Sequence, residues 1–206
     1  LDDTVIVLTS DHGTEFFEHG WKGHRTTLYD EVIRVPLVVR YPKAVPAGVR
    51  IAAQTRSVDI APTLVELCGL EPLRDTSGSS LVEIFTDATA GSGAGKQAVS
   101  ELESVGRSLL AIREQGWKVI GNRAQSTLSA FDLVSDPGEQ HPIGDPGSPL
   151  LSDAMRELDE VGSELDRLAT SHAGPAAGSS PPADVQKHLD DLGYTGEESK
   201  RGPEPR

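Results

Sequence analysis

Two neighbouring side chains near the start of the sequence could ligate a metal ion. Asp11 and His12 follow the apolar run 4–8, and Gly13 after them lets the backbone turn sharply. A carboxylate suits a hard ion such as calcium or magnesium, and an imidazole extends the choice to manganese or zinc. Two ligands do not complete a site, so further ligands must come from elsewhere in the fold. From the pair alone, a helix cap at Asp11 and an ordinary loop histidine at His12 are the simpler interpretation.

A longer motif surrounds this pair. Residues 9–24 read Thr-Ser-Asp-His-Gly-Thr-Glu-Phe-Phe-Glu-His-Gly-Trp-Lys-Gly-His, and Leu-Tyr-Asp-Glu at 28–31 and Ile-Arg-Val-Pro-Leu-Val-Val at 33–39 follow. Further matching segments are Arg-Ser-Val-Asp-Ile-Ala-Pro-Thr-Leu at 56–64, Phe-Asp-Leu-Val-Ser-Asp-Pro-Gly-Glu-Gln at 131–140 and Leu-Gly-Tyr at 192–194. Taken in this order, over most of the chain, these segments resemble the sulfatase family of the alkaline phosphatase superfamily.

The resemblance implies a metal site and an anion site. In that family the Asp of the motif is a metal ligand and its neighbour is a ligand or a direct support, which maps onto Asp11 and His12. The cofactor it implies is a divalent metal ion, calcium first, with manganese, magnesium or zinc as alternatives. His24 falls where many sulfatases have a Lys that contacts the sulfate. A cationic donor there would offset charge on the nonbridging oxygens, so His24 is our candidate catalytic and substrate-binding residue.

His24 has a simpler alternative, and two residues near it carry weaker expectations. The simpler interpretation of His24 is an exposed loop histidine without a functional role. Lys22 is the nearest substitute for the family's Lys, two residues out of register, and is the second substrate-binding candidate. His19 is expected to support the loop structurally rather than to ligate a metal.

The function implied is metal-dependent hydrolysis of sulfuric esters, with a small-molecule or glycan sulfate ester as substrate. Phosphodiester or phosphonate monoester hydrolysis and a phosphoethanolamine-type transfer remain alternatives within the superfamily, and a phosphate ester would then be the substrate. The family's formylglycine nucleophile arises in a Cys/Ser-x-Pro-x-Arg motif, which is absent here, and Cys68 lacks the Pro and Arg spacing. We therefore expect a fragment, inactive alone, whose partner is the missing N-terminal half of the fold. The alternative of another class is a noncatalytic half of a split or decayed enzyme.

Composition limits the partners and the compartment. The formal net charge is −13, with 32 acidic and 19 basic residues, which would repel a phosphate backbone and argues against nucleic acid. No apolar run approaches the roughly 20 residues that span a bilayer. Cys68 is the only cysteine, which excludes an internal disulfide, and its apolar helical setting predicts a small core residue. Localisation stays open, with export as the family's frequent outcome.

The elements that must position the site follow from the hydrophobic pattern. The run 4–8 predicts a buried parallel strand, residues 14–19 one or two helical turns, 36–42 a second strand, and the segment ending at Gly69 a helix. Runs 97–101, 108–113, 117–121 and 127–133 predict a small antiparallel sheet, and apolar steps of three and four predict an amphipathic helix over 148–170.

The expected class is therefore α/β, with the C-terminal part of an alkaline-phosphatase-like α/β sandwich and a small antiparallel sheet packed by a C-terminal helix. We divide the chain into a catalytic core part (1–85), a linker (86–96), a sheet-and-helix subdomain (97–171) and a flexible tail with a short helix (172–206).

Overall fold

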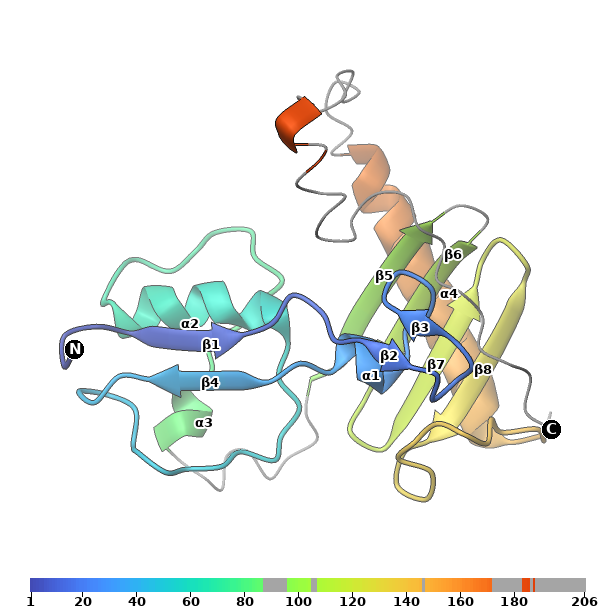
Figure 1. The fold of residues 1–206 in the computed structure, drawn as a ribbon, viewed down its shortest axis with the longest axis horizontal. Coiled ribbons are helices and arrows are strands. Elements are labelled where there is room, and N and C mark those ends of the chain that lie inside the picture. Colours follow the sequence, from blue (N-terminus) through green and yellow to red (C-terminus); the bar gives the residue numbers. More distant parts are fainter. Residues whose placement is uncertain (87–95, 105–106, 146, 172–182, 186, 188–206) are drawn as a thin grey trace.

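The computed structural model describes residues 1–86, 96–104, 107–145, 147–171, 183–185 and 187. Its elements form two groups (Figure 1). The first contains β1 (Ile6–Thr9), β4 (Leu37–Arg40), the 3-10 turn η1 (Ser57–Asp59), α2 (Ile60–Leu67) and α3 (Val82–Thr86). The second contains β5 (Ala98–Ser104), β6 (Arg107–Arg113), β7 (Trp117–Asn122), β8 (Thr127–Asp132) and α4 (Pro149–Ser171). Short elements β2 (Glu15–Phe16), β3 (Lys22–Gly23) and α1 (Asp30–Ile33) lie against this second group.

The first strand differs from the expectation of a buried parallel strand. β1 pairs only with β4 among the described strands, and the pairing is antiparallel, with Val7 opposite Val39. Side chains alternate across this two-stranded sheet. Val7 and Val39 face Ile60 of α2 around a small gap, whereas Leu8 and Val38 lie on the other face, 58% and 56% exposed. The apolar run is therefore buried on one face only.

The four strands β5 to β8 form the predicted antiparallel sheet, in the order β5-β6-β7-β8. The predicted long helix is also confirmed, and α4 packs on one face of this sheet. The core between them contains Ile112, Val119, Ala130 and Ala154, with Leu150, Leu151, Leu158 and Val161 packed around it. The fold class expected from the sequence is confirmed.

The other face of the same sheet is covered by the N-terminal part of the chain. Leu28 and Ile33 pack there against Leu109 and Ala111 of β6. Because one strand carries side chains to both faces, β6 is buried on both sides over much of its length. The segment that contains α1 is thus fixed to a sheet whose first strand begins 65 residues after the end of α1.

Residues 14–19 are not helical, contrary to the expectation. β2 and β3 form a short antiparallel pair, with Glu15 opposite Gly23 and Phe16 opposite Lys22. The backbone turns through Phe17 and Gly20, both at positive φ (75° and 84°). A helix cannot continue through such residues.

Cys68 is exposed rather than part of a core. It lies at the end of α2, where Gly69 adopts a φ of +66°, the left-handed conformation that commonly terminates a helix. The helix that the sequence predicts is therefore present and buries its last residue, Leu67, but the C-cap residue Cys68 lies outside the core.

Most of the expected linker, residues 87–95, lies outside the described residues, and Thr86 is the last residue of α3. Residues 183–185 and 187 are helical, while the rest of the expected tail falls outside the described part. The division into a core part (1–85) and a subdomain (97–171) stays our proposal. Within the described residues, none of the helices combines the length and apolar character that a bilayer crossing requires.

Candidate functional site

The three principal candidate residues meet in one cleft of about 450 Å³. Asp11, His12 and His24 line it, together with Arg25 and residues 100–102 of β5. Asp11 and His12 reach the cleft because they follow the end of β1 directly. The cleft thus lies where the two groups of elements meet.

Gly13 anchors the turn that carries the Asp-His pair. Its backbone N–H donates to the carbonyl oxygen of Val32 in α1 at 2.7 Å. A Cβ atom at this position would lie 2.0 Å from the carbonyl oxygen of Glu31, so any side chain larger than hydrogen would force the two segments apart. A glycine is therefore required by close packing against α1.

Hydrogen bonds orient His12 toward Asp11. Nδ1 of His12 lies 2.8 Å from the carbonyl oxygen of Gly13, so Nδ1 donates, and in the neutral ring Nε2 then carries the lone pair. That Nε2 lies 3.7 Å from Oδ2 of Asp11. A backbone carbonyl that fixes the ring through its other nitrogen is the usual support of a metal-binding histidine. The two atoms are close enough to share one ion with bonds of about 2.0–2.4 Å.

This pair supplies two ligands, and within the described residues no third His, Cys, Asp or Glu joins them to form a three-ligand group. The Ser10 hydroxyl donates to the carbonyl oxygen of His12 at 2.7 Å, which fixes the backbone of the turn. A carboxylate and an imidazole are donors that suit a divalent cation, and further ligands would be needed to complete such a site.

His24 stacks on His12, with ring centroids 3.9 Å apart and an interplanar angle of 24°. Burial lowers the pKa of His24, and charge on His12 and Arg25 lowers it further, while Asp11 opposes the shift. The imidazole is therefore held neutral more readily than an ordinary histidine where it lines the cleft.

Arg25 is a cleft residue that the sequence analysis missed. It is exposed, lines the cleft beside His24 and adopts a φ of +79°. Its place directly after His24 was the only available signal. Lys22, by contrast, lies outside the lining of the cleft, on the short strand β3 with its side chain exposed.

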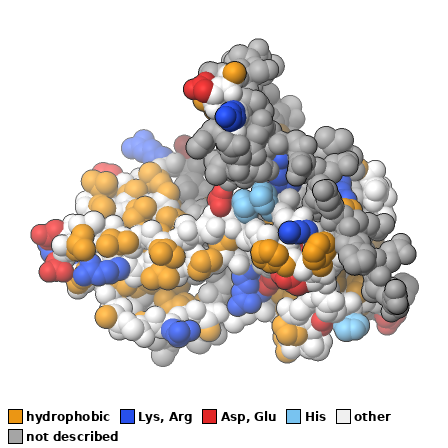
Figure 2. Space-filling view, viewed as in Figure 1, with side chains coloured by type: hydrophobic (Ala, Val, Ile, Leu, Met, Phe, Trp, Pro, Cys, Tyr) orange, Lys and Arg blue, Asp and Glu red, His pale blue; other side chains and the backbone are white. Residues whose placement is uncertain are grey.

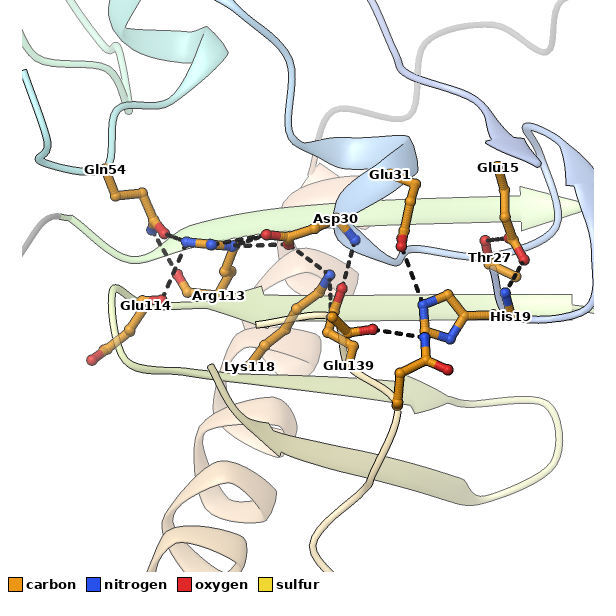
Figure 3. Close-up of polar contacts among 12 residues, drawn as sticks. Glu15, His19, Thr27, Asp30, Glu31, Gln54, Arg113, Glu114, Lys118 and Glu139 are labelled. Carbon is orange, nitrogen blue, oxygen red and sulfur yellow. Dashed lines mark hydrogen bonds and ion pairs between the residues drawn. The ribbon is translucent and has the colours of Figure 1, made fainter. Parts of the chain in front are cut away.

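A buried carboxylate holds the loop that carries His24. Glu15 is 1% exposed and accepts hydrogen bonds from the backbone N–H groups of His19 and Trp21, both at 3.1 Å, and from the hydroxyl of Thr27 at 2.7 Å (Figure 3). These bonds satisfy the charge of Glu15 and close the loop between residues 15 and 27. The loop also contacts the sheet, because the guanidinium of Arg107 in β6 lies 4.5 Å from the centroid of the Trp21 ring.

A second polar cluster joins α1 to the sheet (Figure 3). Asp30 accepts hydrogen bonds from Arg113 at 3.0 and 2.9 Å and lies 3.1 Å from Nζ of Lys118. Lys118 is fully buried and lies 2.7 Å from Glu139, whose other oxygen accepts the backbone N–H of Asp30 at 2.7 Å. Gln54 accepts a short hydrogen bond from Arg113.

The two carboxylates of this cluster respond differently to burial. Burial alone raises the pKa of Asp30, but the hydrogen bonds and charges of Arg113 and Lys118 outweigh it and leave that pKa below its ordinary value. Burial also raises the pKa of Glu139, and there the charge of Lys118 does not cancel the effect. Glu139 of the sequence motif therefore has a structural role, because it holds α1 against the sheet.

Several known proteins similar to this chain are sulfatases. The family model described as N-sulphoglucosamine sulphohydrolase, C-terminal, matches residues 17–161. An N-acetylglucosamine-6-O-sulfatase of Bacteroides thetaiotaomicron is 47% identical over 85 residues, which cover 41% of this chain and 15% of that protein. Arylsulfatase K of Mus musculus is 29% identical over 180 residues, which cover 83% of this chain and 30% of that protein.

A solved structure shares the architecture. The structure of BT4656 in complex with its substrate D-glucosamine-2-N,6-O-disulfate superposes with a TM-score of 0.66 and 28% identity, over 86% of this chain and 37% of that one. The chain thus spans well under half the length of each of these three similar proteins.

Proposed function

This chain belongs to the sulfatase family of the alkaline phosphatase superfamily, and on that premise we propose that it supplies part of the metal and sulfate site of a metal-dependent sulfuric ester hydrolase. The observation that carries the proposal is the orientation of His12. Its Nδ1 is engaged by Gly13, and its Nε2 faces Asp11 in the cleft that also contains His24.

In this proposal Asp11 and His12 ligate a divalent ion, calcium first and manganese, magnesium or zinc as alternatives. The ion supplies Lewis-acid polarisation of the ester oxygens when bound. His24 donates an N–H to a nonbridging oxygen of the sulfuryl group and so stabilises the charge that develops there. Its stacking on His12 fixes the direction of that donor. Lys22 would contact only those parts of a substrate that extend beyond the cleft.

The nucleophile is proposed to come from elsewhere. The formylglycine motif expected of a sulfatase is absent from the printed sequence, and Cys68 lies at the end of α2, exposed. The substrate class we propose is a sulfate ester on a sugar or another small molecule, because a similar structure contains a disulfated glucosamine.

An apolar surface supports the proposal that a further part of the fold packs on this chain. Figure 2 shows hydrophobic side chains gathered over the part that contains β1 and β4. Ile6, Leu8 and Val38 are 38%, 58% and 56% exposed there. An extended pair with an apolar outer face is favourable only when another element covers it. We propose the N-terminal half of the sulfatase fold as that element.

The test is calcium and manganese binding by isothermal titration calorimetry. The chain is measured alone and fused to an upstream sulfatase segment, with Asp11→Asn as the variant and Asp159→Asn on the exposed side of α4 as the matched control. We expect the fused protein to bind one calcium ion, Asp11→Asn to lose it and Asp159→Asn to keep it. For manganese we expect one equivalent fewer in Asp11→Asn than in Asp159→Asn. Unchanged binding in Asp11→Asn would show that the Asp-His pair is only a structural turn.

Substrate class is tested on the same fused protein. Hydrolysis of an aryl sulfate that exceeds hydrolysis of the corresponding phosphate diester and phosphonate monoester supports the sulfatase assignment. The reverse order favours the phosphodiester or phosphonate alternative, and transfer of a phosphoethanolamine group favours the transferase. A fused protein that binds metal but processes none of these esters favours the noncatalytic alternative.

A further inference from the structure

A second group of metal-ligating side chains lies outside the cleft. His19 comes from the turn between β2 and β3, Glu31 from α1 and Glu139 from the loop after β8. One ligand atom of each lies within 4.8 Å of the other two. Figure 3 shows the three side chains converging beneath α1. None of the three lines the cleft that contains Asp11.

The atoms of this group are buried and incompletely satisfied. The side chains of His19, Glu31 and Glu139 are 7%, 24% and 1% exposed. Within the described part of the chain, Nε2 of His19 and Oε2 of Glu31 have no hydrogen-bond partner. Buried polar atoms in native proteins are nearly always partnered. These atoms therefore indicate that the group holds a ligand.

The charges around the group favour a cation. Tyr29 stacks on His19 with ring centroids 3.5 Å apart, and the charges of Glu139, Glu15 and Glu31 act on it. Asp30 is a fourth carboxylate in this region, and it shares Lys118 with Glu139. Among the described residues, only the cations of Arg113 and Lys118 pair with these carboxylates, which leaves two negative charges uncompensated when His19 is neutral.

The spacing fits a transition metal. Nε2 of His19 lies 3.4 Å from Oε1 of Glu31. Two adjacent ligands of a tetrahedral ion with bonds of about 2.0–2.2 Å are about 3.3–3.6 Å apart. One imidazole with two carboxylates suits zinc or manganese better than calcium. The distance is too long for a good hydrogen bond between His19 and Glu31.

We propose that His19, Glu31 and Glu139 bind a second divalent ion, zinc or manganese, which ties the loop, α1 and the segment after β8 together. Glu139 is the weakest of the three ligands, because Nζ of Lys118 already lies 2.7 Å from its Oε1. That oxygen still has a second lone pair for the ion. The affinity therefore depends mainly on His19 and Glu31. This site is independent of the proposed metal site at Asp11.

The experiment is zinc and manganese titration of the full chain that carries Asp11→Asn, which removes the first site. We expect one equivalent of zinc to bind. Adding His19→Gln or Glu31→Gln lowers the affinity by at least about tenfold, by comparison with the cost of losing even an outer support of a metal site. His141→Gln is the matched control, because the His141 side chain is 87% exposed and is not one of the three clustered ligands, and this variant should bind zinc unchanged.

Two further measurements keep the result unambiguous. Circular dichroism in the presence of a chelator checks that each variant folds, and imidazole nitrogen NMR follows the protonation of His19. The proposal is overturned if the Asp11→Asn chain binds no zinc, if folded His19→Gln and Glu31→Gln variants bind it as tightly, or if His19 keeps protons on both nitrogens at saturating zinc. In that last case a proton, rather than a metal, satisfies the two glutamates. Loss of the calcium site in Asp11→Asn has no bearing on any of these outcomes.

Discussion

Replacing Lys118 by Met should be the most destabilising single change in the polar cluster beneath α1. The Lys118 side chain is fully buried and lies 3.1 Å from Asp30 and 2.7 Å from Glu139. Met fills a similar volume but leaves Glu139 as a buried carboxylate without its cation. Removing one partner of a buried pair costs about 3–5 kcal/mol. For a chain of this size that corresponds to a fall in Tm of about 6–20 °C, at about 2–4 °C per kcal/mol.

The predicted loss has a pH signature. Burial raises the pKa of Glu139 even with Lys118 present, and removing the cation raises it further. A carboxyl group whose folded pKa is raised stabilises the fold at low pH, and that contribution is lost as the pH rises through the raised value. The variant should therefore lose less stability at pH 5 than at pH 8.

The assay is urea unfolding of the wild type, Lys118→Met, Glu139→Gln and the double variant, with Lys43→Met as an exposed control. The double variant should be close to Glu139→Gln, because the uncompensated charge is then gone. Lys43, whose partner Asp3 is also exposed, should change stability little. A loss below about 1 kcal/mol in Lys118→Met, or additive losses in the double variant, would refute the reasoning.

Two further predictions concern the turn after β1 and the start of α2. Gly13→Ala places a Cβ about 2.0 Å from the carbonyl oxygen of Glu31, so we expect the free energy of unfolding to fall by about 1–3 kcal/mol and the fused protein to bind calcium more weakly. Gly144→Ala is the control, because open space surrounds Gly144, and it should change neither quantity. Thermal unfolding and titration calorimetry measure the two effects. Burial raises the pKa of Asp59, but hydrogen bonds from Arg56 and a backbone N–H outweigh burial and hold that pKa below its ordinary value. This carboxylate therefore stabilises the fold above about pH 4, and the stabilisation is lost as the pH falls further. Asp59→Asn should cost about 1–3 kcal/mol at pH 7 and flatten the acid side of the stability profile, and an unchanged profile would contradict this prediction.

The sheet and long helix could be predicted because local patterns determine them. The apolar steps of three and four over 148–170 predicted α4, which runs from Pro149 to Ser171. The four short runs correspond to β5 to β8 within a few residues at each end. In these segments the residues that favour a conformation are also those that the core buries.

The errors occurred where distant residues decide the structure. Residues 14–19 carry a helical pattern. The buried carboxylate of Glu15, however, accepts hydrogen bonds from the backbone N–H groups of His19 and Trp21, and these bonds stabilise a loop instead. The run 4–8 suggested burial on both faces, yet in the described structure α2 covers only one. Neither outcome has a signal in the local sequence.

For the candidate site, sequence reasoning identified the residues and the structure supplied their relation. Asp11, His12 and His24 do line one cleft, although their roles stay proposals. Lys22 lies outside it, because a strand register that the motif does not reveal places it opposite Phe16. The cluster of Asp30, Lys118 and Glu139 was missed, since its members are separated by up to 109 residues.

That separation also sets an order of events during synthesis. The first turn of α1 is fastened by the side chain of Glu139, which is added 109 residues after Asp30. At about 5–20 residues per second, the ribosome needs about 5–20 s to reach it. During that interval the residues of the cleft are leaving the ribosome, but the sheet that holds them in place is not yet complete. Premature termination before residue 139 would leave α1, and the Asp-His turn packed on it, without this contact.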